Sequence, residues 1–202
     1  IIVRGDAMIG YPTKRKPVSG TLETSTSKRG MTLEDDLNKT NRYYLELDRA
    51  NVHKKPTPIV VKTVSYPSRN KAKITEAYYK TPSTTDYNGV YRAKALDFEA
   101  KETQSKTAFA LAYLHEHQID HIRSVQRHGA LTFLIIRFTT LNETYFVPAG
   151  EMLAFIDTTS RRSIPIVWFR EHGLSIPWRL TPPIDYLSCV DAYYFKGEML
   201  ND

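Results

Sequence analysis

The chain has 202 residues, of which 41% are hydrophobic and 25% charged, proportions that are ordinary for a globular protein with its own core. No apolar run approaches the roughly 18 residues that a membrane-spanning helix needs, and the single cysteine, Cys189, excludes an internal disulfide. These features lead us to expect a cytoplasmic protein that does not enter a membrane.

The net charge of +6 is concentrated in two segments. Residues 1–30 carry six basic and two acidic side chains, and residues 51–80 carry seven basic side chains against Glu76, whereas the remainder is slightly acidic. Concentrated positive charge favours a polyanionic partner, because each neutralised phosphate releases a counterion. We expect nucleic acid to be that partner, although a basic surface that meets only solvent is the alternative. The candidate DNA-contacting residues are Arg29, Lys54, Lys55, Lys62, Arg69, Lys71, Lys73 and Lys80.

The first 30 residues are polar, rich in Ser, Thr, Lys and Pro, and show no hydrophobic period. This composition predicts a flexible basic arm, followed by one domain over residues 31–202. Thr32 is a suitable N-cap, and Glu34 begins a run of acids where a helix dipole favours them. Together with near-helical spacing of apolar residues, these signals predict a helix from about 32 to 48.

A basic hairpin is predicted next. Residues 51–55 and the β-branched run 59–66 have the composition of strands, and a turn separates them from a return strand at 74–79. Prolines flank the hairpin on both sides. We interpret the segment of about 56–80 as an inserted stalk that protrudes from the domain and not as a layer of its core.

The second half of the chain alternates between helical and strand patterns. We predict a helix over 111–128, a buried strand over 131–138, a strand near 145–147, and helices near 149–157 and 183–195. This order of elements indicates an α/β fold with a central mixed β-sheet flanked by helices.

One strand carries a pattern that suits a metal-dependent phosphodiesterase. Because side chains alternate along a strand, Asp97, Glu99 and Lys101 share one face of the run from Leu96 to Glu102. Asp86 precedes Glu99 by thirteen positions. Two carboxylates can bind Mg²⁺ through oxygen, and an ammonium beside them can stabilise charge on an attacked phosphate. The alternative is a half-buried strand whose charged face is simply solvated.

Three further residues are candidates for the same site. Thr84, two residues before Asp86, can add a neutral oxygen, and Gln118 places an amide on the apolar stripe of the later helix. Glu34 lies near the start of the first helix, where dipole complementarity is a sufficient alternative explanation.

Histidines offer a rival metal site. His117 and His121 have the i, i+4 spacing of a zinc pair, but the hydrolytic zinc motif requires Glu where this chain has Gln118. No cysteine lies nearby to complete a structural site. We therefore prefer an oxygen-ligated ion and assign these histidines to the surface or to contact with DNA.

Several motifs together resemble the RecU family of Holliday junction resolvases. They occur in order over most of the chain: Arg29–Leu37, His53–Pro58, Pro82–Gly89, Asp97–Thr103 and the pair His117-Gln118. The resemblance implies membership of the PD-(D/E)xK nuclease superfamily, with a restriction-endonuclease-like core. The chain departs from the family pattern after Thr103 and in its last helix.

The resemblance also implies a site and partners. Mg²⁺, for which Mn²⁺ substitutes, is held by Thr84, Asp86, Glu99 and Gln118, with Lys101 as transition-state stabiliser and Glu34 as a further acid. A homodimer is implied that makes paired symmetric nicks in four-way DNA junctions during recombination and repair at the nucleoid. RecA and RuvAB are implied partners. Two alternatives remain: a non-catalytic DNA-binding or RecA-modulating protein, and a less selective nuclease.

Overall fold

A computed structural model describes residues 32–68, 71–80 and 84–197. The helices are α1 (Leu33–Glu46), α2 (Glu116–Arg127), α3 (Ala149–Thr158), α4 (Ile166–His172) and α5 (Tyr186–Tyr194), with a 3₁₀ turn at Leu111–Tyr113. The strands are β1 (Asn51–Lys54), β2 (Ile59–Ser68), β3 (Lys71–Tyr79), β4 (Tyr87–Tyr91), β5 (Lys94–Thr103), β6 (Ala108–Ala110), β7 (Leu131–Phe138), β8 (Glu143–Pro148), β9 (Ser163–Pro165) and β10 (Leu174–Ser175). The expected arm at 1–30, which includes Arg29, lies outside the described residues, as does Arg69 of the expected turn.

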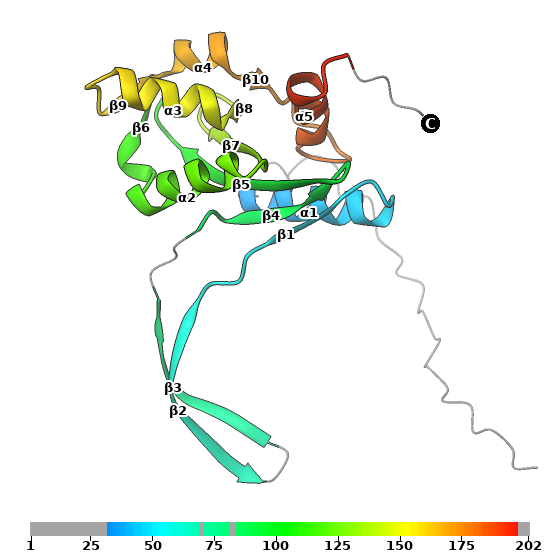
Figure 1. Ribbon diagram of the computed structural model, residues 1–202, viewed down its shortest axis with the longest axis vertical. Coiled ribbons are helices and arrows are strands. Elements are labelled where there is room, and N and C mark those ends of the chain that lie inside the picture. Colours follow the sequence, from blue (N-terminus) through cyan, green and yellow to red (C-terminus); the bar gives the residue numbers. More distant parts are fainter. Residues whose placement is uncertain (1–31, 69–70, 81–83, 198–202) are drawn as a thin grey trace, which may run out of the picture. The chain divides into compact units, whose positions relative to one another are not determined.

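Within the described part of the chain, six strands form one sheet in the order β1-β4-β5-β7-β8-β10 (Figure 1). Strands β5 and β7 are parallel, with α2 in the connection between them, and every other neighbouring pair is antiparallel. The predicted α/β class, with a central mixed sheet flanked by helices, is confirmed.

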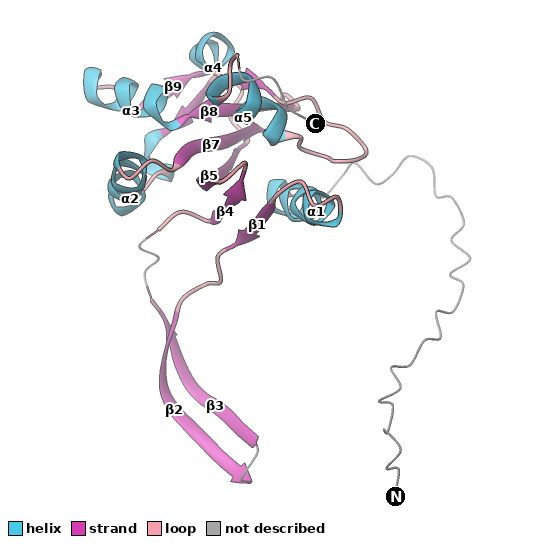
Figure 2. Ribbon diagram, turned by 45° about the vertical axis from the view of Figure 1, so that its right-hand side comes forward, coloured by secondary structure: helices cyan, strands magenta, loops and turns pink. Residues whose placement is uncertain are grey.

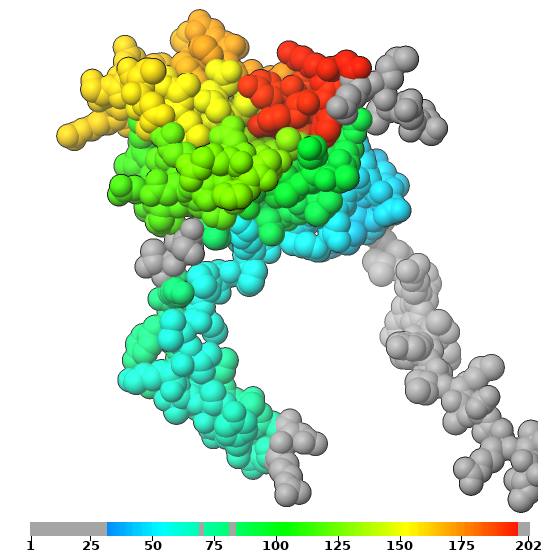
Figure 3. Space-filling view, in the orientation of Figure 1, coloured from blue at the N-terminus to red at the C-terminus, as the bar shows by residue number. Residues whose placement is uncertain are grey.

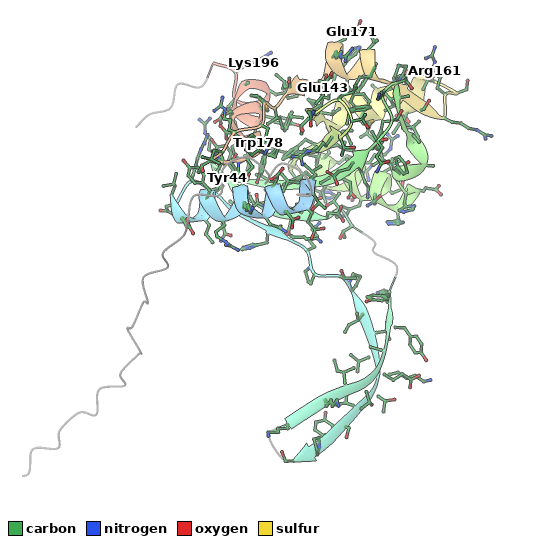
Figure 4. All side chains as sticks on the ribbon, turned by 180° about the vertical axis from the view of Figure 1, so that it is seen from behind. Tyr44, Glu143, Arg161, Glu171, Trp178 and Lys196 are labelled. Atoms are coloured by element: carbon green, nitrogen blue, oxygen red, sulfur yellow. The ribbon has the colours of Figure 1, made fainter. Side chains whose placement is uncertain are left out.

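The alternation of side chains along β7 divides the core into two clusters. Phe133 and Ile135 pack with residues of α1 and α5, whereas Leu134 and Ile136 pack with residues of α2, α3 and α4. Figure 2 shows the helices on the two sides of these strands. A strand covered on both faces requires apolar residues at successive positions, which explains the unbroken run that predicted this strand. Tyr44 of α1, labelled in Figure 4, is fully buried in the first cluster.

Helix α1 is capped in the expected way. The Thr32 hydroxyl accepts a hydrogen bond from the backbone N–H of Asp35, and the Asp35 carboxylate accepts from the backbone N–H of Thr32. The Glu102 carboxylate on β5 accepts a further hydrogen bond, of 2.8 Å, from the backbone N–H of Leu33. Strand β5 thus satisfies one of the free donors of the helix and fixes its start against the sheet.

The predicted helix over 111–128 was wrong at its beginning. Strand β6 pairs with β9, and the backbone N–H of Leu111 donates to the carbonyl of Arg162 at 2.9 Å. The chain then makes a 3₁₀ turn, and Leu114 is extended, so α2 starts only at Glu116 after His115 as N-cap. The apolar stripe continues through both segments because both cover the same core.

The predicted hairpin is present as β2 and β3, which form a two-stranded sheet of their own. None of the described residues of either strand is buried (Figure 3). The ladder has three register irregularities. No described helix combines the length and apolar character that crossing a membrane requires.

Gly89 generates a stability prediction, because it pairs with Val52 of β1 and the backbone of that strand lies very close to it. A Cβ atom at Gly89 would lie 2.3 Å from the carbonyl oxygen of Asn51 and 2.6 Å from the Cα of Val52. Gly89→Ala should therefore separate β1 from β4 and lower the free energy of unfolding by roughly 2 kcal/mol in urea denaturation. Gly150→Ala in α3 is the matched control, since its Cβ meets only the Gln126 side chain at 3.6 Å. Equal stability of the two variants would contradict the prediction.

Candidate functional site

The β4–β5 register explains the thirteen-residue spacing between two acids. These antiparallel strands pair Tyr87 with Phe98, so the next position outward places Asp86 beside Glu99. The backbone N–H of Asp86 donates to Oε2 of Glu99 at 3.2 Å. We call Asp86 and Glu99 the acid pair. The spacing is therefore the length of a tight hairpin, with Glu99 on β5 and Asp86 immediately before β4.

Glu99 is completely buried, with 0% of the residue exposed. The Lys101 ammonium lies 2.6 Å from Oε1 of Glu99, on the same face of β5. That contact lacks hydrogen-bond geometry, and Oε1 has no aligned hydrogen-bond partner among the described residues. Because Glu99 is buried, the alternative of a solvated charged face is wrong at this position. The structure leaves a carboxylate oxygen available for a further electropositive partner.

The negative charges of Asp86 and Glu99 repel each other. The pKa of Glu99 is raised to about 8, first by burial and then by the Asp86 carboxylate, while Lys101 acts in the opposite direction. Two neighbouring carboxylates in a low dielectric disfavour double ionisation, and a divalent cation between them would reverse that preference. The donor set therefore fits a hard cation.

Among the described residues, no group of three or more Asp, Glu, His or Cys side chains has the arrangement of a metal site. A cation at the acid pair would thus depend on two carboxylates, neutral oxygens and water, a donor set that Mg²⁺ accepts and that structural zinc does not. Thr84 lies close by in sequence, and its hydroxyl donates to the Thr85 carbonyl at 3.3 Å.

Gln118 is buried, but its amide already has a structural role. Its Oε1 accepts a hydrogen bond of 3.1 Å from the backbone N–H of His115 and closes the capping box of α2. The ligand role expected for Gln118 therefore stays a prediction. The rival zinc pair gains no support, because the ring of His121 faces Asp97, at 3.2 Å from Nε2 to Oδ1, and the ring of His117 stacks on that of His115.

Glu34 lies in the first turn of α1 and forms an ion pair of 2.5 Å with Lys54 at the end of β1. Lys54 pairs in register with Tyr87, next to the acid pair. The pKa of Tyr87 is raised well above its ordinary value, first by burial and then by the charge of Glu34, followed by Asp86. Glu34 therefore belongs to the same electrostatic environment as the acid pair.

The described basic residues differ in their availability for DNA. Lys55 is engaged inside the protein, because its ammonium lies 2.9 Å from both Asp97 and Thr85. Lys62 pairs with Glu76 at 3.0 Å. Among the described residues of the hairpin, the other basic side chains are exposed and lie in β3 or directly after it: Lys71, Lys73 and Lys80.

A groove with a volume of about 230 Å³ lies beside the acid pair, at the base of the hairpin. Its lining comes from the two segments that connect the hairpin to the sheet: Lys54, Lys55, Pro56, Thr57, Pro58, Thr84, Thr85 and Asp86. Asp86 and the stalk base thus share one concave surface. Sequence patterns placed Asp97 on the correct face but did not indicate that it and Thr85 contact Lys55.

A pH-dependent stability follows from the raised pKa of Glu99. Folding moves this pKa from its ordinary 4.5 to about 8, so the carboxyl loses its contribution to stability as pH rises between those values. Glu99→Gln in EDTA should therefore match the wild type at low pH and exceed its unfolding free energy by roughly 4 kcal/mol near pH 8. Urea denaturation at several pH values measures this.

Glu143→Gln is the matched control for that experiment. A hydrogen bond from Arg170 is the main cause that lowers the pKa of Glu143, so this variant should be less stable than the wild type at neutral pH. If both variants changed the unfolding free energy in the same direction, the role assigned to burial at Glu99 would be contradicted.

Comparison with known proteins identifies relatives over most of the chain. The family model described as Recombination protein U matches residues 28–192. A protein of Geobacillus kaustophilus (strain HTA426) named Holliday junction resolvase RecU is 54% identical over 84% of this chain and 86% of its own. Proteins of the same name from Geobacillus sp. (strain WCH70) and Shouchella clausii (strain KSM-K16) are 49% and 46% identical, over 92% and 94% of this chain and 94% of each relative.

A solved structure of Archaeoglobus fulgidus Hjc, titled a Holliday junction resolvase, covers 69% of this chain and 94% of its own at 11% identity. Its TM-score of 0.40 is too low to carry a conclusion about this chain. The sequence relatives suffice, because a family model spans most of the chain and identities of 46–54% extend over most of both proteins. This chain belongs to the RecU family of recombination proteins.

Proposed function

We propose that this protein is a divalent-metal-dependent endonuclease that resolves four-way DNA junctions by paired, symmetric nicks during recombination and repair. The observation that carries the proposal is the acid pair with Lys101, next to the base of an exposed basic hairpin. Relatives of 46–54% identity bear the name Holliday junction resolvase RecU, which agrees with this activity.

The acid pair, Thr84 and Gln118 are the proposed holders of Mg²⁺, with Mn²⁺ as a substitute, and Glu34 is a further acid near them. Gln118 would have to share the amide oxygen that caps α2. When bound, the cation supplies Lewis acidity to the phosphodiester and lowers the pKa of a water molecule.

Lys101 contributes directly to the proposed reaction. Its ammonium is held beside the acid pair by Glu99 Oε1, at 2.6 Å. A fixed positive charge in a partly buried site stabilises the negative charge that develops on the phosphate. Attack of water in line with the leaving oxygen would release a 5′-phosphate and a 3′-hydroxyl.

The stalk is the proposed element that selects junctions over plain duplex, because it presents exposed lysines along β3, from Lys71 near the turn to Lys80 near the groove at its base. Paired nicks require two active sites, so the functional unit is proposed to be a homodimer. RecA and RuvAB are proposed partners, and the proposed place of action is the nucleoid. A non-catalytic DNA-binding or RecA-modulating role and a less selective nuclease are the alternatives.

Cleavage of a four-way junction tests the catalytic assignment. Asp86→Asn removes half of the acid pair, and Lys101→Met removes the ammonium, so each should reduce nicking by at least about a thousandfold. Binding of the same junction in EDTA should remain, since neither side chain belongs to the stalk. Nicking by the wild type should stop in EDTA and return with Mg²⁺.

Retained nicking by either variant would reject the assigned residues. A wild type that binds junctions but never nicks them would support the non-catalytic alternative, and equal cleavage of linear duplex would support the less selective nuclease.

The stalk assignment is tested by salt dependence of junction binding. Replacement of Lys71, Lys73 and Lys80 by Gln should weaken binding and reduce the slope of log K against log salt by up to about 3, near 0.9 per phosphate contact. Lys62→Gln is the matched control, because Glu76 already pairs with Lys62 and its effect should be smaller. An unchanged slope in the triple variant would exclude phosphate contacts by these residues.

A further inference from the structure

Asp97 is a buried carboxylate with several partners that the catalytic assignment does not use. It is 7% exposed, and Thr85 is 2% exposed. The Lys55 ammonium lies 2.9 Å from Oδ2 of Asp97 and also 2.9 Å from the Thr85 hydroxyl oxygen. The Thr85 hydroxyl donates to Oδ1 of Asp97, and His121 Nε2 lies 3.2 Å from the same oxygen without hydrogen-bond alignment. We call these four residues the Asp97 cluster.

Every contact in the Asp97 cluster includes a residue from one of the two segments that carry the acid pair, and the bond from Thr85 to Asp97 joins those two segments directly. Asp97 precedes Glu99 by two residues on the same face of β5, and Thr85 immediately precedes Asp86. The backbone N–H of Lys55 donates to the carbonyl of Asp86 at 2.7 Å. Lys55 therefore holds the Asp86 segment through its backbone and, through its ammonium, ties that segment to β5.

The Asp86 segment needs such an attachment because Asp86 lies outside strand β4. Strand β4 and its pairing with β5 begin at Tyr87, so the paired strand residues do not include Asp86. The hydrogen bond from the Asp86 backbone to Glu99 is long, at 3.2 Å. The charge-assisted link between Lys55 and Asp97, which is partly buried, is a stronger restraint on the same loop.

We propose that Lys55 and Asp97 are positioning residues that hold the Asp86 carboxylate in register with Glu99 for a shared divalent cation. This inference rests on the proposed function and deepens it, because it assigns a lysine at the stalk base to the metal site and not to DNA. Lys55 acts through Asp86, and Asp97 acts through Thr85, so neither needs to contact the cation or the phosphate.

The test uses the full chain and Mn²⁺ as the probe. Lys55→Met and Asp97→Asn each leave one partner of a partly buried ion pair without the other, which can destabilise the fold. The double variant Lys55→Met/Asp97→Asn removes both charges and keeps an amide oxygen for Thr85, so it should fold. Three readouts are compared with the wild type: melting temperature, Mn²⁺ affinity without DNA by titration calorimetry, and junction affinity in EDTA.

A second buried ion pair supplies the matched control. Arg137 and Asp36 lie 2.6 Å apart, with side chains 11% and 3% exposed, and they join β7 to α1. The double variant Asp36→Asn/Arg137→Met should change the melting temperature and leave the Mn²⁺ affinity of the folded protein unchanged. It separates a general loss of stability from a loss of positioning.

The expected result is a weakening of Mn²⁺ binding by about 10- to 100-fold in the folded double variant, with junction affinity in EDTA preserved. Unchanged Mn²⁺ affinity in that variant would overturn the inference, as would an equal loss in the Asp36/Arg137 control. Loss of junction affinity with normal Mn²⁺ binding would also overturn it and would indicate that Lys55 contacts DNA. A wild type that neither binds Mn²⁺ nor nicks junctions would instead reject the proposed function itself.

Discussion

The burial of the Glu99 carboxylate is the constraint on which the rest of the site depends. A buried carboxylate is costly unless charges and donors compensate it, and here the compensation is incomplete. Lys101 supplies an ammonium and Asp86 a backbone N–H, yet one oxygen lacks an aligned partner and the pKa is still raised. In the folded chain the negative charge of Glu99 is thus not fully compensated, and a divalent cation would be most favourable at this position.

The sheet creates that position through local geometry. Strand β5 is central, and its apolar side chains Leu96 and Phe98 are buried with α1 and α5, which turns the charged residues to the other face. The ring of Tyr87 stacks on that of Phe98 at 4.8 Å, across the last paired position before the acid pair. Packing between the strands therefore fixes the register that brings two carboxylates together.

Hydrophobic patterning and capping residues were sufficient to predict the elements whose surroundings are uniform along their length. The run at β7 and the capped start of α1 were predictable because burial on both faces and helix capping leave direct traces in the sequence. The start of α2 was not, since an apolar stripe does not distinguish a helix from an extended segment that covers the same core. Helix α4 and the strands β6, β9 and β10 are too short for a recognisable period, and pairing between distant segments creates the strands.

Charge patterning predicted less of the site than the spacing of the acids did. A sum over residues 51–80 counts Lys55, Lys62 and Lys71 equally, but the first is tied to Asp97, the second to Glu76, and the third is exposed. Only contacts between distant segments distinguish them, and a sequence window does not contain those contacts. The distinction has a structural consequence, because Lys55 lies where the hairpin leaves the sheet and where the Asp86 segment returns to it. A lysine at this place can hold the two carboxylates of the acid pair in position only if its ammonium is paired with an acid inside the protein. The buried carboxylate of Asp97 provides that partner.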